Sequence, residues 1–249
     1  MIKNLSLEIK GGEIIFITGA SGIGKSTLIN ILYRFYDPIK GNVFIDDQNV
    51  KDLKFSFRDR ISICAQNHLF FNDSVINNLR AANINKYYKQ NPIKDFIQTD
   101  EKIEEYVAIN EAPEKEIEEL CRYFNLYNKI MSLEDNFEYV IGENGNKLSG
   151  GERQRLNIIR ALLKPADIYI FDEPTNFLDV VNEQIFFNKV EELRREGKTV
   201  IIISHQLSFA DHCDKILCYN REGGYEYGTK DELIEQNGNF SRTLSTSYV

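Results

Sequence analysis

A glycine-rich segment near the N-terminus contains the residue types that bind the phosphates of a nucleotide. Its pattern is G-x-x-x-x-G-K-[ST], in which the glycines let successive backbone N–H groups point at phosphate oxygens. The lysine adds a positive charge, and the following hydroxyl is a ligand for Mg²⁺. The pattern predicts a nucleotide and magnesium site made by Gly19, Ala20, Ser21, Gly22, Ile23, Gly24, Lys25, Ser26 and Thr27. A dinucleotide site is excluded, because Thr27 stands where its fingerprint requires a third glycine.

Two adjacent carboxylates follow a short apolar run farther along the chain. Asp172 and Glu173 come directly after the residues 168–171. The carboxyl ends of parallel strands are where α/β folds bind ligands, so we expect Asp172 to hold Mg²⁺ and Glu173 to act as general base on an attacking water. Taken alone, such a pair is more often a strand end that enters a turn, here at Pro174. The phosphate loop upstream favours the catalytic interpretation, because phosphoryl transfer needs mainly positioning and charge neutralisation.

Alternating strands and helices are expected to position these residues. Pro38, Pro165 and Gly197 are placed to end three of the helices. The polar, helix-leaning stretch 72–130 interrupts the strands and predicts an inserted helical sub-domain. The pattern predicts an α/β fold with a mainly parallel sheet flanked by helices. We expect strands at 13–18, 43–45, 61–64, 168–172, 199–204, 215–219 and 225–228, and helices at 25–36, 150–164, 180–196 and, as the last helix, 230–236.

The composition limits the classes of function. The chain has 42% hydrophobic and 27% charged residues, which is ordinary for a globular protein. Its net charge of -8 argues against nucleic acid as the main partner, because phosphate binding requires clustered Lys and Arg. The 4 cysteines have no C-x-x-C spacing, so we expect free thiols. No apolar run approaches the ~18 residues of a membrane-spanning helix, so a membrane role would come through a partner or another part of the protein.

The segment Leu148-Ser149-Gly150-Gly151-Glu152 lies between the phosphate loop and the carboxylates. This order of motifs resembles the ATP-binding cassette (ABC) family of ATPases. The resemblance implies a P-loop NTPase of ABC type that binds ATP and Mg²⁺, hydrolyses ATP and works as a pair. In that family the LSGG segment reaches the ATP held by a second cassette. Ser149 and the N–H groups of Gly150 and Gly151, at a helix N-terminus, are expected to complete the partner's γ-phosphate site.

The resemblance extends over nearly the whole chain. Gln66 matches the Q-loop glutamine, which implies contact with Mg²⁺ and sensing of a membrane domain. Asp179, in Phe177-Leu178-Asp179, matches the D-loop, and His205 matches the switch histidine that contacts the γ-phosphate. The stretches 35–38 and 140–145 resemble exporter-type cassettes, in which the second stretch contacts the coupling helices of a transmembrane domain. These matches imply catalytic roles for Glu173, His205, Gln66 and Lys25, and metal binding by Ser26, Gln66 and Asp172.

The same resemblance implies a single domain over residues 1–249. Its RecA-like core would occupy about 1–71 and 165–249, and its helical sub-domain about 72–164. The family's adenine-stacking aromatic would lie before Met1, so we expect that segment to be absent and ATP to bind more weakly by roughly tenfold or more. The chain would then be either a fragment of a longer transporter or a shortened cassette. The acidic segment at about 80–113 is longer than in most cassettes. It is either a solvated insertion or a docking surface for a partner.

Three functions remain open. The first is the ATP-hydrolysing subunit or domain of an ABC exporter, at the cytoplasmic face of a membrane through a transmembrane partner, paired with an identical or different cassette. The second is a non-transport ABC ATPase that acts on ribosomes or DNA, although the chain lacks a second cassette and a basic run. The third is a truncated cassette that binds nucleotide without turnover, against which the presence of both Glu173 and His205 argues.

Overall fold

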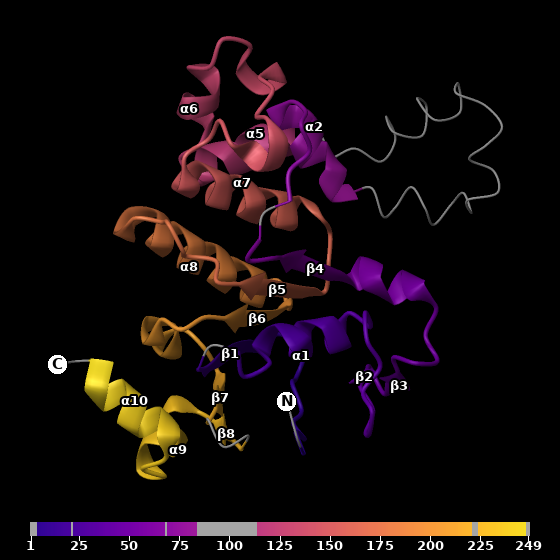
Figure 1. Cartoon of the computed structure of the whole chain (residues 1–249), viewed down its shortest axis with the longest axis vertical. Coiled ribbons are helices and arrows are strands. Elements are labelled where there is room, and N and C mark those ends of the chain that lie inside the picture. Colours follow the sequence, from indigo (N-terminus) through magenta and orange to yellow (C-terminus); the bar gives the residue numbers. More distant parts are fainter. Residues whose placement is uncertain (1–3, 21, 68, 84–113, 221–223, 248–249) are drawn as a thin grey trace. The chain divides into compact units, whose positions relative to one another are not determined.

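The computed structural model describes residues 4–20, 22–67, 69–83, 114–220 and 224–247 (Figure 1). The chain divides into two compact units. The first consists of Met1–Ile63, Asp167–Pro174 and Phe187–Val249, and the second of Cys64–Ala166 and Thr175–Phe186. The chain therefore leaves the first unit and returns to it twice. Within the described ranges, no helix is long and apolar enough to span a membrane.

A six-stranded sheet in the spatial order β4-β5-β6-β1-β7-β8 runs through the first unit. β1 pairs in parallel with β6 and with β7, and β5 pairs in parallel with β6, whereas β7 and β8 are antiparallel. The prediction of a mainly parallel sheet is confirmed. A separate antiparallel pair is formed by β2 (Phe44–Ile45) and β3 (Gln48–Asn49). The strands of the large sheet are β1 (Ile14–Gly19), β4 (Ile61–Cys64), β5 (Ile168–Asp172), β6 (Thr199–Ile203), β7 (Lys215–Tyr219) and β8 (Tyr225–Gly228).

Both faces of the sheet are covered, which explains why its central strands β1, β5 and β6 are largely apolar. On one face, Ile15 and Ile17 belong to a core cluster that includes Ile29 of α1 (Lys25–Leu32). On β1, Phe16 points the other way and stacks on Phe209, with ring centroids 5.7 Å apart. Phe209 also contacts Phe187, near the middle of α8 (Val180–Arg195). Both layers therefore fix β1, which leads into the phosphate loop.

The helix α1 ends four residues earlier than the predicted end at residue 36. Arg34 has a φ of 55°, in the left-handed region. The N–H of Arg34 donates to the carbonyl of Ile31 (3.0 Å), and the N–H of Phe35 donates to that of Asn30 (2.7 Å). This is a Schellman motif, which reverses the chain and satisfies the last carbonyls. The prediction was wrong because the motif usually has glycine at this position, and Pro38 was the only visible stop signal.

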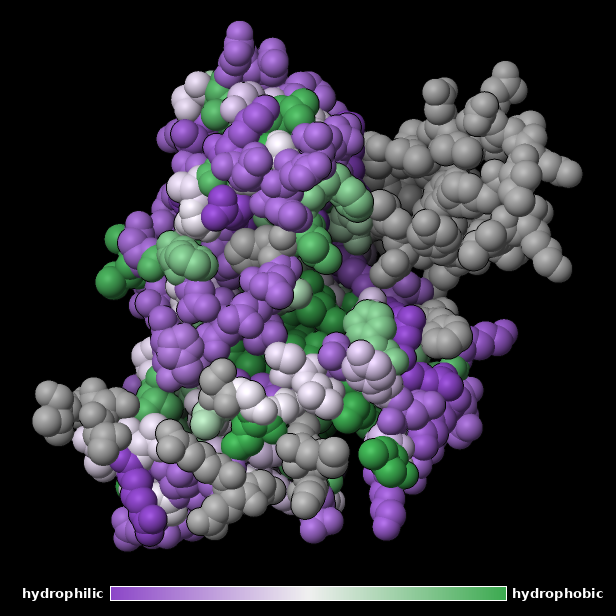
Figure 2. Space-filling model, in the orientation of Figure 1, coloured by the Kyte–Doolittle hydropathy of each residue, from purple (hydrophilic) through white to green (hydrophobic). Residues whose placement is uncertain are grey.

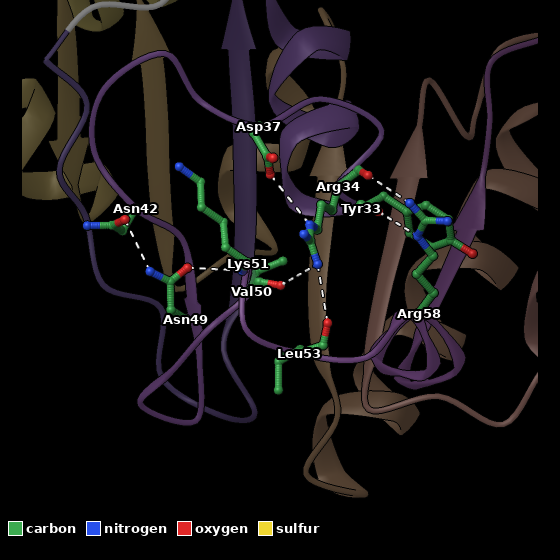
Figure 3. Close-up of polar contacts among 9 residues, drawn as sticks. All are labelled: Tyr33, Arg34, Asp37, Asn42, Asn49, Val50, Lys51, Leu53 and Arg58. Atoms are coloured by element: carbon green, nitrogen blue, oxygen red, sulfur yellow. Dashed lines mark hydrogen bonds and ion pairs between the residues drawn. The ribbon is translucent and has the colours of Figure 1, made fainter.

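Two arginines fasten this end of α1 (Figure 3). Arg34 Nη1 donates to the carbonyls of Val50 and Leu53 (3.2 Å each) and Nε lies 3.4 Å from the Asp37 carboxylate. Arg58, in a 3₁₀ helix (Phe55–Arg60), donates to the carbonyls of Tyr33 (2.9 Å) and Arg34 (2.7 Å). Cations at a helix C-terminus stabilise the macrodipole. The C-terminal end of α1 is therefore fixed from two sides.

The second unit is helical. Its helices α2 (Val75–Arg80), α5 (Glu114–Tyr123) and α6 (Tyr127–Met131) precede α7 (Gly150–Leu163), and α7 contacts α2 and α5. Hydrophilic residues, purple in Figure 2, predominate over the face of α5 and α6 seen there. The predicted acidic segment at about 80–113 lies outside the described residues from 84 onward.

The C-terminal part contains one helix more than predicted. α9 (Lys230–Glu235) begins at a capping box of Thr229 and Glu232, but α10 (Asn239–Ser247) follows it. The expectation that residues 230–236 form the last helix is therefore wrong. α10 is rich in Ser and Thr, which have weak helix propensity, and its packing through the fully buried Phe240 is a tertiary effect. Glu226 on β8 accepts the N–H groups of Asn239 and Phe240 and so caps this helix.

Candidate functional site

The phosphate-loop residues join the end of β1 to the start of α1. Gly19, Gly22 and Gly24 have φ angles of 142°, 77° and 113°, which residues with a Cβ rarely adopt. A Cβ on Gly19 would lie 2.9 Å from both the Cβ and the carbonyl oxygen of Tyr219 on β7. The loop conformation therefore depends on glycine. Ser21 lies outside the described residues.

The loop has donors available for an anion. In the described part of the chain, the N–H groups of Gly22, Ile23 and Gly24 donate no hydrogen bond, and the first turn of α1 has no acidic side chain. Lys25 Nζ donates to the carbonyls of Gly19 (2.7 Å) and Ala20 (3.2 Å). Unengaged N–H groups at a helix N-terminus beside an ammonium group suit a phosphate. The residues therefore fit nucleotide phosphates, and Ser26 and Thr27 are exposed in the same turn.

Asp172 ends β5 at the carboxyl edge of the sheet. Its side chain is buried, with 8% of the residue exposed. Burial and the neighbouring charge of Glu173 raise the pKa of Asp172 to about 6, and the charge of Lys25 opposes this shift. A buried carboxylate beside a second one is poorly compensated by the protein alone, and a hard cation would compensate it. Asp172 is therefore chemically suited to bind a magnesium ion.

Glu173 is held by both its backbone and its side chain. Its φ is 51°, and its N–H donates to the carbonyl of Ile203 on β6 (2.7 Å). One carboxylate oxygen, Oε2, accepts the hydroxyl of Ser204 (2.9 Å) and lies 3.0 Å from Nδ1 of His205. The structure thus brings together the predicted residues Glu173 and His205. The side chain of His205 is 66% exposed, so its ring also reaches solvent.

Ser204 is a site residue that the sequence analysis missed. It is fully buried, and its hydroxyl oxygen also accepts the N–H of Gln206 (3.2 Å). The signal available in the sequence was a hydroxyl residue directly after a buried strand and before His205. Its contact with Glu173 follows from the register of β5 and β6, in which Asp172 pairs with Ile203. That pairing cannot be read from the sequence.

The LSGGE segment opens α7, in the second unit. Ser149 is the N-cap, and its hydroxyl accepts the N–H of Glu152 (3.3 Å) while Glu152 accepts the N–H of Ser149 (2.8 Å). This capping box gives Glu152 a local role that the sequence analysis did not assign. A Cβ on Gly150 would lie 3.2 Å from the ring of Phe177, and one on Gly151 would lie 2.8 Å from the carbonyl oxygen of Phe177. Both glycines therefore allow Phe177 to lie against the signature segment.

Asp179 begins α8. Its Oδ1 accepts both the N–H and the side-chain Nδ2 of Asn182, each at 2.8 Å. The backbone hydrogen bond from Asn182 lowers the pKa of Asp179, so the carboxylate is favoured. Two residues before it, Phe177 is 75% exposed and has a φ of 68°. The predicted D-loop is thus an exposed turn fixed at its end by a helix cap.

The predicted site residues fall into two groups, one in each unit. The phosphate loop, Asp172, Glu173 and His205 belong to the first unit, and Gln66, Ser149, Gly150, Gly151 and Asp179 to the second. Gln66 is exposed two residues after β4. Within the described ranges, no three His, Cys, Asp or Glu residues form a metal cluster. A magnesium ion would therefore need further oxygen ligands, which for this metal are commonly phosphates and water.

A phosphate loop between a parallel strand and a helix, with buried carboxylates at the neighbouring strand end, defines a P-loop nucleotide-binding domain. The model of the ABC transporter family matches residues 2–176. The chain therefore belongs to the ABC transporter family, and this membership implies ATP binding. The sequence-based interpretation of its family and fold is confirmed.

Relatives of known name agree with this assignment. The chain is 35% identical over 241 residues to the ATP-dependent lipid A-core flippase of Hahella chejuensis, covering 96% of this chain and 37% of that protein. It is 34% identical over 249 residues to the flippase of the same name from Haemophilus influenzae, covering 100% and 38%. A solved structure, a bacterial Atm1-family ABC exporter with ATP bound, has a TM-score of 0.84 and 29% identity and covers 100% of this chain and 39% of its own. The chain thus spans under two fifths of the length of these relatives.

Proposed function

We propose that this chain is the ATP-binding and ATP-hydrolysing domain of an ABC exporter. The observation that carries the proposal is the carboxylate of Glu173, which Ser204 and His205 hold at the strand ends of the unit that contains the phosphate loop. A general base in this position suits hydrolysis, because the reaction mainly requires an oriented water and neutralised charge. The names of the relatives, two flippases and one exporter, support transport as the work that hydrolysis drives.

Each residue of the phosphate site would have one task. Lys25 would exchange the carbonyls of Gly19 and Ala20 for phosphate oxygens, and the loop N–H groups would bind the same anion. Ser26, Asp172 and Gln66 would hold Mg²⁺, which neutralises phosphate charge when bound. Glu173 would orient water and accept its proton. His205 would contact the terminal phosphate while its Nδ1 keeps Glu173 in position.

The second unit would complete the site of another cassette. Ser149, Gly150, Gly151 and Asp179 are proposed to meet the ATP held by that partner, which is either identical or different. The partner assembly would include a transmembrane domain, placing the chain at the cytoplasmic face of a membrane. The first and second units would correspond to a RecA-like core and a helical sub-domain within one ABC ATPase domain.

The test is Mg²⁺-dependent ATPase activity of the purified chain beside Glu173→Gln and Lys25→Ala, with pairing followed by light scattering. We expect turnover in the wild type, an ATP-dependent pair in Glu173→Gln, and no ATP binding in Lys25→Ala. ATP binding without turnover would favour a cassette that only binds nucleotide. Co-purification of the native protein with RNA or DNA instead of membranes would favour a non-transport ATPase.

A further inference from the structure

The short segment that carries Gln66 is held at both ends by one helix of the second unit. At its start, Asn157 Nδ2 donates to the carbonyl of Ala65 (3.0 Å) and lies 3.1 Å from Sγ of Cys64. At its far end, Arg160 Nη1 donates to the carbonyl of Leu69 (2.7 Å). Asn157 and Arg160 are one turn apart on α7, so both ends of the segment are fixed to the same face of this helix.

The two side chains form a single unit. Arg160 Nη2 donates to Oδ1 of Asn157 (3.2 Å), and the guanidinium carbon of Arg160 lies 4.7 Å from the ring centroid of Phe70. Asn157 is 3% exposed, and burial lowers the pKa of Arg160. Buried polar groups of this kind are costly to separate from their partners. The segment around Gln66 therefore cannot shift relative to α7 without breaking the hydrogen bonds from Asn157 and Arg160.

A second path leads from the same segment to the signature turn. The carbonyl of Phe70 accepts the N–H of Asn144 (3.3 Å), and the Phe70 ring lies 3.1 Å from where a Cβ of Gly145 would be. Arg153 then donates to the carbonyls of Gly145 (3.4 Å) and Leu148 (2.7 Å). Leu148 directly precedes Ser149, the N-cap of α7. Both paths end at the start of α7, one along the helix and one beside it.

We propose that Asn157, Arg160 and Phe70 are positioning residues that couple the place of Gln66 to the orientation of the signature segment. Gln66 and Ser149 themselves do not share a hydrogen bond within the described residues. A displacement of the Gln66 segment would be transmitted to α7, because the carbonyls of Ala65 and Leu69 accept hydrogen bonds from side chains of this helix. The N-terminal end of α7 has Ser149 as its cap and Gly150 and Gly151 in its first turn. The effect on ATP hydrolysis by a pair of cassettes rests on the proposed function, whereas the coupling between the Gln66 segment and α7 does not.

The test uses Asn157→Ala and Arg160→Met, with Arg122→Met as the control. Arg122 is exposed on α5 and pairs with Glu118, away from the Gln66 segment in sequence. Hydrogen exchange of the amides in residues 65–71 is measured first. We expect it to speed up by up to roughly tenfold in the two α7 variants, the factor that corresponds to the loss of one hydrogen bond, and not in the control. Unchanged exchange in both α7 variants would show that Asn157 and Arg160 do not hold the Gln66 segment, and would overturn the proposal.

The second readout is catalytic. We expect ATP affinity and KM to stay within about twofold, kcat to fall roughly tenfold, and the ATP-driven pairing of Glu173→Gln to weaken similarly. Arg160→Lys should retain more activity than Arg160→Met, because lysine can still donate to Leu69. Equal losses of affinity, KM and kcat would indicate a general structural role and overturn the coupling. A wild type that neither pairs nor turns over ATP would refute the proposed function. Hydrogen exchange would still test whether the Gln66 segment is coupled to α7.

Discussion

At the scale of single residues, Glu173 combines a strained backbone with a fixed side chain. A φ of 51° costs a non-glycine residue on the order of 1 kcal/mol, and such strain persists only where surrounding contacts over-determine it. Here the contacts are the N–H bond to Ile203 and the two side-chain contacts to Ser204 and His205. The arrangement fixes the direction of one carboxylate oxygen, which is what a base acting on an oriented water requires.

Ser204→Ala is expected to lower kcat by about tenfold or more with little change in KM. The hydroxyl donates to a buried carboxylate, and a hydrogen bond to a charged group contributes roughly 1.5–3 kcal/mol. Steady-state ATPase kinetics measure the effect, and Ser204→Thr serves as the control because it keeps the hydroxyl. Equal kcat values for the alanine variant and the wild type would show that Glu173 does not depend on Ser204.

Motif spacing predicted Lys25, Asp172 and Glu173 because each stands at a fixed offset from a strand or a glycine loop, and the family resemblance added His205. It could not predict which of them touch. The contact of Ser204 with Glu173 depends on strand register, and the contact of Lys25 with the carbonyls of Gly19 and Ala20 depends on the curl of the loop. Neither is encoded in local pattern.

At the scale of elements, the start of α7 and the turn at Phe177 are fitted to each other. Gly150→Ala is expected to destabilise the chain by about 1 kcal/mol, the lower end of the overpacking range, because its Cβ would press on the exposed Phe177 ring. Phe177→Ala should relieve that cost, giving a favourable interaction energy in the double variant. Urea unfolding of the four proteins measures the cycle.

The neighbouring glycine provides the contrast. A Cβ on Gly151 would meet the backbone oxygen of Phe177 at 2.8 Å, so Phe177→Ala should not rescue Gly151→Ala. Rescue of Gly151→Ala as well would mean that the backbone at Phe177 moves away from α7 once the ring is removed. Rescue of neither would mean that the ring is not the source of the cost at Gly150.

The starts of β4, β5 and β6 are joined by exposed charges. Asp167 accepts from Arg60 Nε (2.7 Å) and lies 3.4 Å from Lys198 Nζ. The hydrogen bond from Arg60 lowers the pKa of Asp167, so its contribution to stability is present above the unfolded pKa and is lost as pH falls through the folded pKa. Asp167→Asn should therefore reduce the free energy of unfolding at pH 7 by about 0.2–1 kcal/mol, since exposed pairs are screened.

The check is urea unfolding of Asp167→Asn and wild type from pH 7 to acid, at low and high salt. The difference between the two should shrink as pH falls and as salt rises. A difference that grows toward acid pH would contradict the assigned sign.

Element positions followed from the sequence where apolar runs were bounded by clear stop signals. β4, β5, β7 and β8 have the predicted bounds, and α7 ends at Leu163, one residue before the predicted end, with Lys164 as its cap before Pro165. The end of α1 and the existence of α10 did not follow. The first depends on the two arginines of Figure 3, and the second on the burial of Phe240 and on Glu226 from another element. Both are tertiary effects that override local propensity.

At the scale of the whole molecule, the residues proposed for one ATP site are divided between the two units. The groups proposed to bind phosphate and to activate water lie in the first unit, and Gln66 and the signature residues lie in the second. The segment Thr175–Phe186 belongs to the second unit through contacts such as the hydrogen bond from Asn125 Nδ2 to Asn182 Oδ1 (3.4 Å). Such contacts join residues far apart in the sequence and cannot be predicted from local pattern. If the signature of each chain completes the ATP site of its partner, a variant with a defective phosphate loop and a variant with a defective signature should complement each other.

Mixing Lys25→Ala with Gly151→Asp is expected to restore ATPase activity that neither variant has alone. In the proposed twofold pair, each site would take its phosphate loop from one chain and its signature from the other. A mixed pair therefore has one site with both defects and one intact site, and random mixing should recover roughly a quarter of wild-type turnover. Steady-state activity against the mixing ratio, with a maximum near equal amounts, measures this.

Mixed pairs that form but recover no activity would mean either that both sites must be intact, or that each site is built within one chain. A second mixture, of wild type with the double variant Lys25→Ala/Gly151→Asp, separates these two explanations. Its mixed pairs keep an intact site only if each site lies within one chain.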